Sequence, residues 1–232
     1  MTHIQNVDSF TQVVEFCSGF GGVYNPGQTN LQLPALRKQL EEVRMQIELV
    51  KVAKAQLDWL VNERRYVFDQ LPRLAARIMR TLEASRASAE MLADARQYVR
   101  ELVGKPKSRP AEQPASHPHS QLAFTSKVDT FIKLIEALQR EPLYKPNEPY
   151  LQVNNLMAHA NGLQQMNNRV DQARTTYRFA IIKRNHLLYL DFYSVSNTLW
   201  AVKKYLRAVF GWGSPEYNLV RKYEIVKPTL RK

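Results

Sequence analysis

The chain has 232 residues, of which 44% are hydrophobic, and a formal net charge of +12 at pH 7. That length supports one large domain or two small ones with buried cores, and a single cysteine, Cys17, excludes an internal disulfide. We interpret Cys17 as a small buried hydrophobe and place the protein in the reducing cytoplasm. The N-terminal residues do not resemble a secretory signal, and no apolar run is long enough to span a bilayer.

Two stretches of the chain repeat at an offset of about 120 residues. Residues 24–36 align with residues 144–156 without a gap, and both begin with Tyr-x-Pro. Just upstream, residues 7–15 match residues 128–136. Because a repeat at fixed spacing describes architecture, we predict two homologous repeats, residues 1–103 and 121–232.

Repeat one begins with a predicted amphipathic helix over about residues 7–18, followed by the Tyr-x-Pro loop and a long helix. Steps of four and three from residue 36 to residue 71 give an apolar seam interrupted by Lys54 and Arg64. Such a helix needs a partner to cover its stripe, and Pro72 suits the first turn of a new helix. We therefore expect the chain to reverse near residues 69–73 and to return as one helix over residues 73–103.

The predicted linker covers residues 104–120, where prolines recur every four residues and no hydrophobic periodicity survives. Extended, it could span roughly 50 Å. It therefore leaves open whether the repeats pack parallel or antiparallel, and whether their short first helices exchange between repeats.

Repeat two follows the same order, with a short helix over about residues 126–141 and a long seam interrupted by Arg174 and Arg184. A reversal is expected near residues 190–194. The second return helix is shorter because Phe210-Gly-Trp-Gly-Ser-Pro215 interrupts it, and residues 217–228 are predicted to form an extended tail. These features predict an all-α fold, in which two repeats of a short helix and a long helical hairpin form a pseudo-symmetric elongated bundle.

Several segments of repeat two resemble a group of bacterial helical proteins built as tandem copies of such a hairpin unit. The segments are Tyr144-Lys-Pro-Asn-Glu148, Arg184-Asn185 with Leu188-Tyr189, Lys203-Lys-Tyr205, Phe210-Gly211, Ser214-Pro-Glu-Tyr217 with Val220, and Lys227-Pro228. Repeat one keeps Tyr24 and Pro26 but lacks the Lys-Lys-Tyr and Phe-Gly elements. The resemblance implies architecture and supplies no catalytic residues, since the group has no established activity.

Cations stand at equivalent places in the two seams, with Lys54 matching Arg174 and Arg64 matching Arg184. A charged side chain buried in a seam that excludes water costs free energy of folding unless an opposite charge pairs with it. One interpretation is that these side chains reach the edge or pair with Glu63, Asp58 or Asp171. The other is a cationic groove for an anionic ligand or partner.

Charge is concentrated in the second half of the chain. Residues 1–120 hold 16 Lys and Arg against 13 Asp and Glu, whereas residues 121–232 hold 17 against 8. The candidate basic surface comprises Arg178, Lys183, Lys203, Lys204, Arg207, Arg221 and Lys222. Such a surface is either a solvated face or a site for sequence-independent contact with nucleic acid. The aromatic-rich stretch 186–212 fits a core, a dimer contact or a membrane interface.

Catalysis has little support, because the chain lacks a nucleophile elbow, a phosphate loop and any His-Glu-x-x-His pattern. We therefore predict no catalytic, cofactor or metal residues. The sequence favours a non-enzymatic helical scaffold or protein-interaction module with a protein partner or self-association. Two alternatives are a basic protein that contacts nucleic acid, and an enzyme with a site between the repeats.

Overall fold

The computed structural model describes residues 2–103 and 118–227, and every regular element in these ranges is helical. The all-α prediction is confirmed. The long helices are α2 (Leu33–Asp69) and α6 (Val153–Asn185). The remaining elements are α1 (His3–Gly19), η1 (Gly21–Val23), η2 (Thr29–Leu31), α3 (Leu71–Ala84), α4 (Ala89–Val103), α5 (Pro118–Arg140), η3 (Pro149–Leu151), η4 (His186–Leu190, a π-helical turn), α7 (Val195–Phe210) and α8 (Pro215–Arg221).

The chain forms two compact units, and each draws on both repeats. Unit 1 combines Met1–Ala55 with Thr175–Lys232, and unit 2 is Gln56–Arg174. Unit 1 therefore holds α1 and the first part of α2 from repeat one, together with the end of α6, α7 and α8 from repeat two. Its α1 contacts α7 and α8, so the short first helix packs against elements of the other repeat.

The short first helices α1 and α5 bury equivalent faces. On α1 the buried positions include Val7, Phe10 and Cys17, and the matching positions of α5, 121 residues later, are Val128, Phe131 and Leu138. Cys17 is fully buried, and this burial raises the pKa of its thiol to about 12. It therefore serves as a core hydrophobe, as predicted.

The Tyr-x-Pro loops share one structural device. The Tyr24 hydroxyl donates to the carbonyl of Leu31 at 2.7 Å, and the Tyr144 hydroxyl donates to that of Leu151 at 2.9 Å. Both tyrosines are 5% exposed. A buried hydroxyl needs such a partner, so each tyrosine fixes its loop against the following 3-10 turn.

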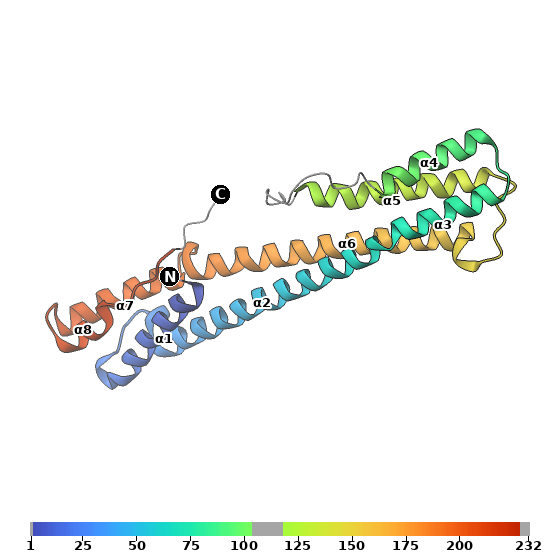
Figure 1. The fold of residues 1–232 in the computed structure, drawn as a ribbon. Coiled ribbons are helices and arrows are strands. Elements are labelled where there is room, and N and C mark those ends of the chain that lie inside the picture. The colour runs from blue at the N-terminus through green and yellow to red at the C-terminus, as the bar shows by residue number, and fades with distance from the viewer. Residues whose placement is uncertain (1, 104–117, 228–232) are drawn as a thin grey trace. The chain divides into compact units, whose positions relative to one another are not determined.

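The predicted reversals near residues 69–73 and 190–194 are wrong. At the first, Gln70 keeps right-handed helical angles (φ −82°, ψ −22°), and α3 runs onward from the end of α2 (Figure 1). Pro72 removes one backbone donor there, which interrupts the helix without turning the chain back. At the second, the π-helical turn η4 and an N-cap at Ser194 lead from α6 into α7.

The chain turns back later, between α3 and α4 and between α7 and α8 (Figure 1). The return helix predicted for residues 73–103 is consequently two helices, separated at residues 85–88. Each second helix is capped by a serine whose hydroxyl accepts from a backbone amide at 3.1 Å, Ser88 from Met91 and Ser214 from Tyr217. In unit 2, α4 packs against both α3 and α5.

The C-terminal segment differs from the predicted tail at its start, because residues 217–221 belong to α8. The extended part begins after it. Asn6 of α1 holds this part through both groups of its side-chain amide, which donates to the Val226 carbonyl at 2.9 Å and accepts from the Val226 amide at 3.1 Å. At the other predicted boundary, α5 begins at Pro118, while residues 104–117 of the linker lie outside the described residues.

Candidate functional site

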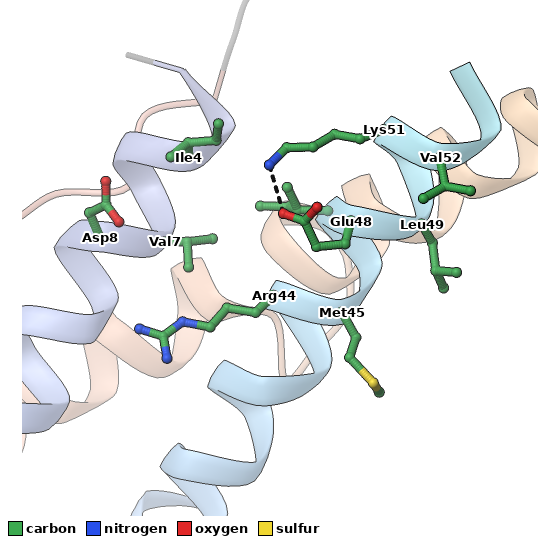
Figure 2. Close-up of a pocket in the computed structure, with 10 residues that line it drawn as sticks. Ile4, Val7, Asp8, Arg44, Met45, Glu48, Leu49, Lys51 and Val52 are labelled. Atoms are coloured by element: carbon green, nitrogen blue, oxygen red, sulfur yellow. Dashed lines mark hydrogen bonds and ion pairs between the residues drawn. The ribbon is translucent and has the colours of Figure 1, made fainter. Parts of the chain in front are cut away.

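A groove of about 600 Å³ in unit 1 is lined by residues of α1 and α2 (Figure 2). Its floor is formed by Val7 and Ile47, which are 5% and 9% exposed. Its apolar edges are at least half exposed, with Ile4 on α1 and Met45, Leu49 and Val52 on α2. We call these six residues the apolar groove. Large apolar side chains left this open to water are typical of docking surfaces when they cluster.

Helix α2 carries two apolar stripes at this level. Leu40, Val43 and Ile47 follow the predicted seam and are buried in the core of unit 1. Met45, Leu49 and Val52 follow a second run of four-and-three spacing that the core does not use. Figure 2 shows Met45 and Leu49 projecting from the side of α2 away from α1, so this stripe extends the lining of the groove onto the outer face of α2. A helix with apolar residues on two faces has one face available to a partner.

Repeat two shows that the fold does not require this second stripe. At an offset of 120 residues, Met45, Leu49 and Val52 correspond to Gln165, Arg169 and Gln172 on α6, and all three of these are exposed. The same positions are thus polar in one repeat and apolar in the other. The exposed apolar side chains of repeat one are therefore not needed for folding, which makes them candidates for contact with a binding partner.

Four charged residues border the apolar groove, namely Asp8, Arg44, Glu48 and Lys51. Lys51 pairs with Glu48 at 2.6 Å, and the Arg44 guanidinium donates to the Thr11 hydroxyl on α1 at 3.0 Å. The border is therefore balanced in charge. An apolar centre with a polar, charged rim is the usual anatomy of a protein–protein contact.

The four seam cations occupy different environments. Lys54 is exposed on α2 and belongs to unit 1 with Arg184, whereas Arg64 and Arg174 belong to unit 2. Arg174 pairs with Asp171 at 3.8 Å, one of the predicted partners. Arg184 donates from Nε and Nη2 to the amide oxygen of Asn185, at 3.2 and 2.9 Å.

Arg64 is the most buried of the four, with 2% of its surface exposed. Its guanidinium lies 4.2 Å from the ring centre of Phe124, and its Nε and Nη1 atoms have no hydrogen-bond partner among the described residues. Burial, together with the nearby charge of Arg174, lowers the pKa of Arg64. Burial likewise lowers the pKa of Arg184. The equivalent residues Arg64 and Arg184 thus share a pKa that burial lowers, although their hydrogen bonding differs.

Some cations of the candidate basic surface are exposed to water, and others contact neighbouring groups of the protein. Arg178, Lys183, Arg221 and Lys222 are exposed. Lys203 donates to the Arg221 carbonyl at 2.9 Å, and burial lowers its pKa. Lys204 and Arg207 are exposed on α7 and lie over the rings of Trp200 and Trp212, at 3.6 and 4.4 Å from the ring centres.

The seam analysis missed the apolar groove because it followed a single stripe along α2. The signal was present in the sequence, since the 120-residue alignment sets Met45, Leu49 and Val52 against polar residues of repeat two. Within residues 2–103 and 118–227, no His, Cys, Asp and Glu side chains gather in threes that could hold a metal ion. Over the same ranges, no helix is long and apolar enough to cross a membrane.

Comparison with known proteins gives no relative to which a role could be traced. No protein-family model matches the chain, and neither the curated proteins nor the solved structures give a significant match.

Proposed function

We propose that this protein is a non-enzymatic interaction module that docks a helical segment of a protein partner in the apolar groove. The single observation that carries the proposal is the contrast between the exposed Met45, Leu49 and Val52 and their polar counterparts in repeat two. The spacing of these side chains along one helix fits the apolar face of a second helix. A cytoplasmic location, in keeping with the lone thiol, belongs to the same proposal.

A partner helix suits this groove better than a small molecule. Pockets for small molecules enclose most of the ligand's surface, whereas the groove edges here remain 50–65% exposed. The apolar centre and balanced rim also suit a helix with its own charged flanks. A second copy of this chain would satisfy the same requirements, so the proposal includes self-association through this face.

The test uses a photo-crosslinking amino acid at position 49 of the full chain in its native cell. We expect adducts to one protein segment with apolar residues at helical spacing, identified by mass spectrometry. Adducts to α2 of a second copy would show self-association. The matched control carries the same amino acid at position 165, the equivalent of Met45 in repeat two, and should give no such adducts.

A swap variant completes the test. Met45→Gln, Leu49→Arg and Val52→Gln together give α2 the residues that α6 carries at these positions, so the helix should fold normally. The variant should lose the crosslinked partner while keeping its far-UV circular dichroism. Equal adduct yields from positions 49 and 165, or a partner retained by the swap variant, would refute the proposal.

A further inference from the structure

A second exposed surface, on α7 and the turns at its two ends, has a different chemistry from the apolar groove. Trp200, Lys204 and Arg207 follow each other at steps of four and three, which places them along one side of α7. Tyr193 lies in the turn just before this helix. Trp212 returns to this side, because the Arg207 guanidinium lies 4.4 Å from its ring centre. Together with Phe192, these residues make up what we call the aromatic-cationic face.

The aromatic side chains of this face are unusually open to water. Phe192 is 81% exposed, Tyr193 63%, Trp200 60% and Trp212 59%. Leu190, the last residue of η4, is 57% exposed. Large aromatic and apolar side chains are usually buried, so the concentration of exposed ones on α7 and its flanking turns needs a physical reason outside the core of unit 1.

The turn that carries Phe192 is held by several hydrogen bonds. Asn197 donates from its side-chain amide to the carbonyls of Asp191 and Phe192, at 3.2 and 3.3 Å. Gln39 of α2 donates to the Tyr193 carbonyl at 2.6 Å, and His186 contacts the Asp191 carboxylate at 2.8 Å. The turn thus presents Phe192 outward on a fixed support.

Repeat one again provides an internal comparison. The register between α3 and α7 holds at 120 residues, since Ala75 matches Val195 and Leu82 matches Val202, all four of them buried. At this register Trp200 corresponds to Arg80, Lys204 to Ala84 and Phe192 to Pro72. The aromatic-cationic face is therefore a property of repeat two that the shared fold does not require.

We infer that the aromatic-cationic face binds the surface of an anionic lipid bilayer. Phe192 and Leu190 gain from insertion among acyl chains, and indole and phenol rings favour the interface between lipid and water. Lys204 and Arg207 lie beside the rings, where they would meet anionic headgroups. The surrounding charge agrees, because residues 175–227 hold nine Lys and Arg against three Asp and Glu.

A nucleic acid fits this face less well. A base needs an open ring face on which to stack, and a cation already covers one face of each indole, Lys204 on Trp200 and Arg207 on Trp212. The Leu190 side chain, which is aliphatic, cannot stack on a base at all. These features favour a lipid surface, and nucleic acid becomes an outcome of the test.

The test measures binding of the full chain to vesicles of phosphatidylcholine containing 30% phosphatidylserine, by co-sedimentation at 100 mM salt. We expect binding to these vesicles, little binding to pure phosphatidylcholine, and weakening as salt rises. Phe192→Ala with Trp200→Ala should weaken binding about tenfold or more through lost apolar insertion. Lys204→Gln and Arg207→Gln should each weaken it about fivefold.

Matched controls alter exposed residues that do not belong to this face. Tyr66→Ala removes an aromatic side chain that is 70% exposed on α2, and Lys38→Gln removes an exposed cation of the same helix. Both should bind like the unaltered chain, and all variants should keep their circular dichroism because each changes only exposed side chains.

Two results would overturn the inference. One is failure of the unaltered chain to bind the anionic vesicles. The other is that the unaltered chain binds a 30-nucleotide single strand more tightly than vesicles at equal phosphate concentration, and that the Phe192→Ala, Trp200→Ala variant no longer binds this strand. That result would assign the face to nucleic acid.

Discussion

Arg64 shows at the scale of one residue how the two repeats diverge. Its equivalent Arg184 uses the next residue, Asn185, as a hydrogen-bond acceptor. In repeat one the next residue is Arg65, which has no acceptor to offer. Arg64 is thus a buried cation whose Nε and Nη1 atoms have no hydrogen-bond partner among the described residues, and its guanidinium lies over the Phe124 ring.

Replacing Arg64 by Met should therefore stabilise the protein. The change removes a buried, incompletely bonded charge and keeps an unbranched side chain that can pack on Phe124, so we expect the free energy of unfolding to rise by about 1–3 kcal/mol. Denaturant unfolding followed by circular dichroism measures it. Arg184→Met is the matched control and should give no such gain, because Arg184 has its hydrogen bonds. A loss of stability in Arg64→Met would show that the cation contributes to the fold.

The sequence predicted the burial of individual residues better than any other feature of the structure. The seam spacing identified Leu36, Leu40, Val43 and their counterparts in repeat two as core residues, and they are buried. The spacing could not distinguish Lys54, which is exposed, from Arg64, which is buried. That difference depends on which helix covers each position, and periodicity along one helix does not contain this information.

At the scale of elements, the turn between α3 and α4 and the turn between α7 and α8 place different residue types at positive φ. Gly211 ends α7 with φ +91°, whereas the first turn contains Arg86 at φ +58°. A side chain with a Cβ atom is strained in this left-handed region, and glycine is not.

Arg86→Gly should therefore stabilise the α3–α4 hairpin. Relief of the strain, offset in part by the greater freedom of glycine in the unfolded chain, should raise the free energy of unfolding by roughly 0.5–1 kcal/mol. The matched change Ser85→Gly removes a side chain from right-handed helical backbone in the same turn (φ −77°) and should destabilise. Thermal unfolding of both variants measures whether each is more or less stable than the unaltered chain. A less stable Arg86→Gly variant would contradict the strain argument.

The turns were the least predictable elements. Pro72 fits both the start of a new helix after a reversal and an interruption in a helix that runs on, and sequence spacing is the same in either case. The observed turns carry better signals, since Gly211 allows the left-handed conformation and Ser88 and Ser214 cap the helices that follow.

At the scale of the whole molecule, the repeats of the sequence and the compact units of the fold do not coincide. Alignment shows which residues are equivalent, and equivalent residues are buried whether a short helix packs in its own repeat or in the other. Alignment therefore could not show whether each short helix packs within its own repeat or against the other. The structure packs α1 with α7 and α8, and places the first part of α6 in the same unit as the last part of α2.

Because each unit needs both repeats, neither repeat should fold as a monomer. Fragments 1–110 and 111–232 each supply only part of either core, so a monomeric fragment should lack cooperative thermal unfolding. Mixed together, the fragments should form a one-to-one complex, seen by native mass spectrometry, with the circular dichroism of the intact chain. The matched control is the full chain with a protease site inserted after residue 110, whose halves should stay together on size-exclusion chromatography after cleavage. A monomeric fragment that unfolds cooperatively would contradict the exchanged packing, because it would have to build a core from one repeat alone.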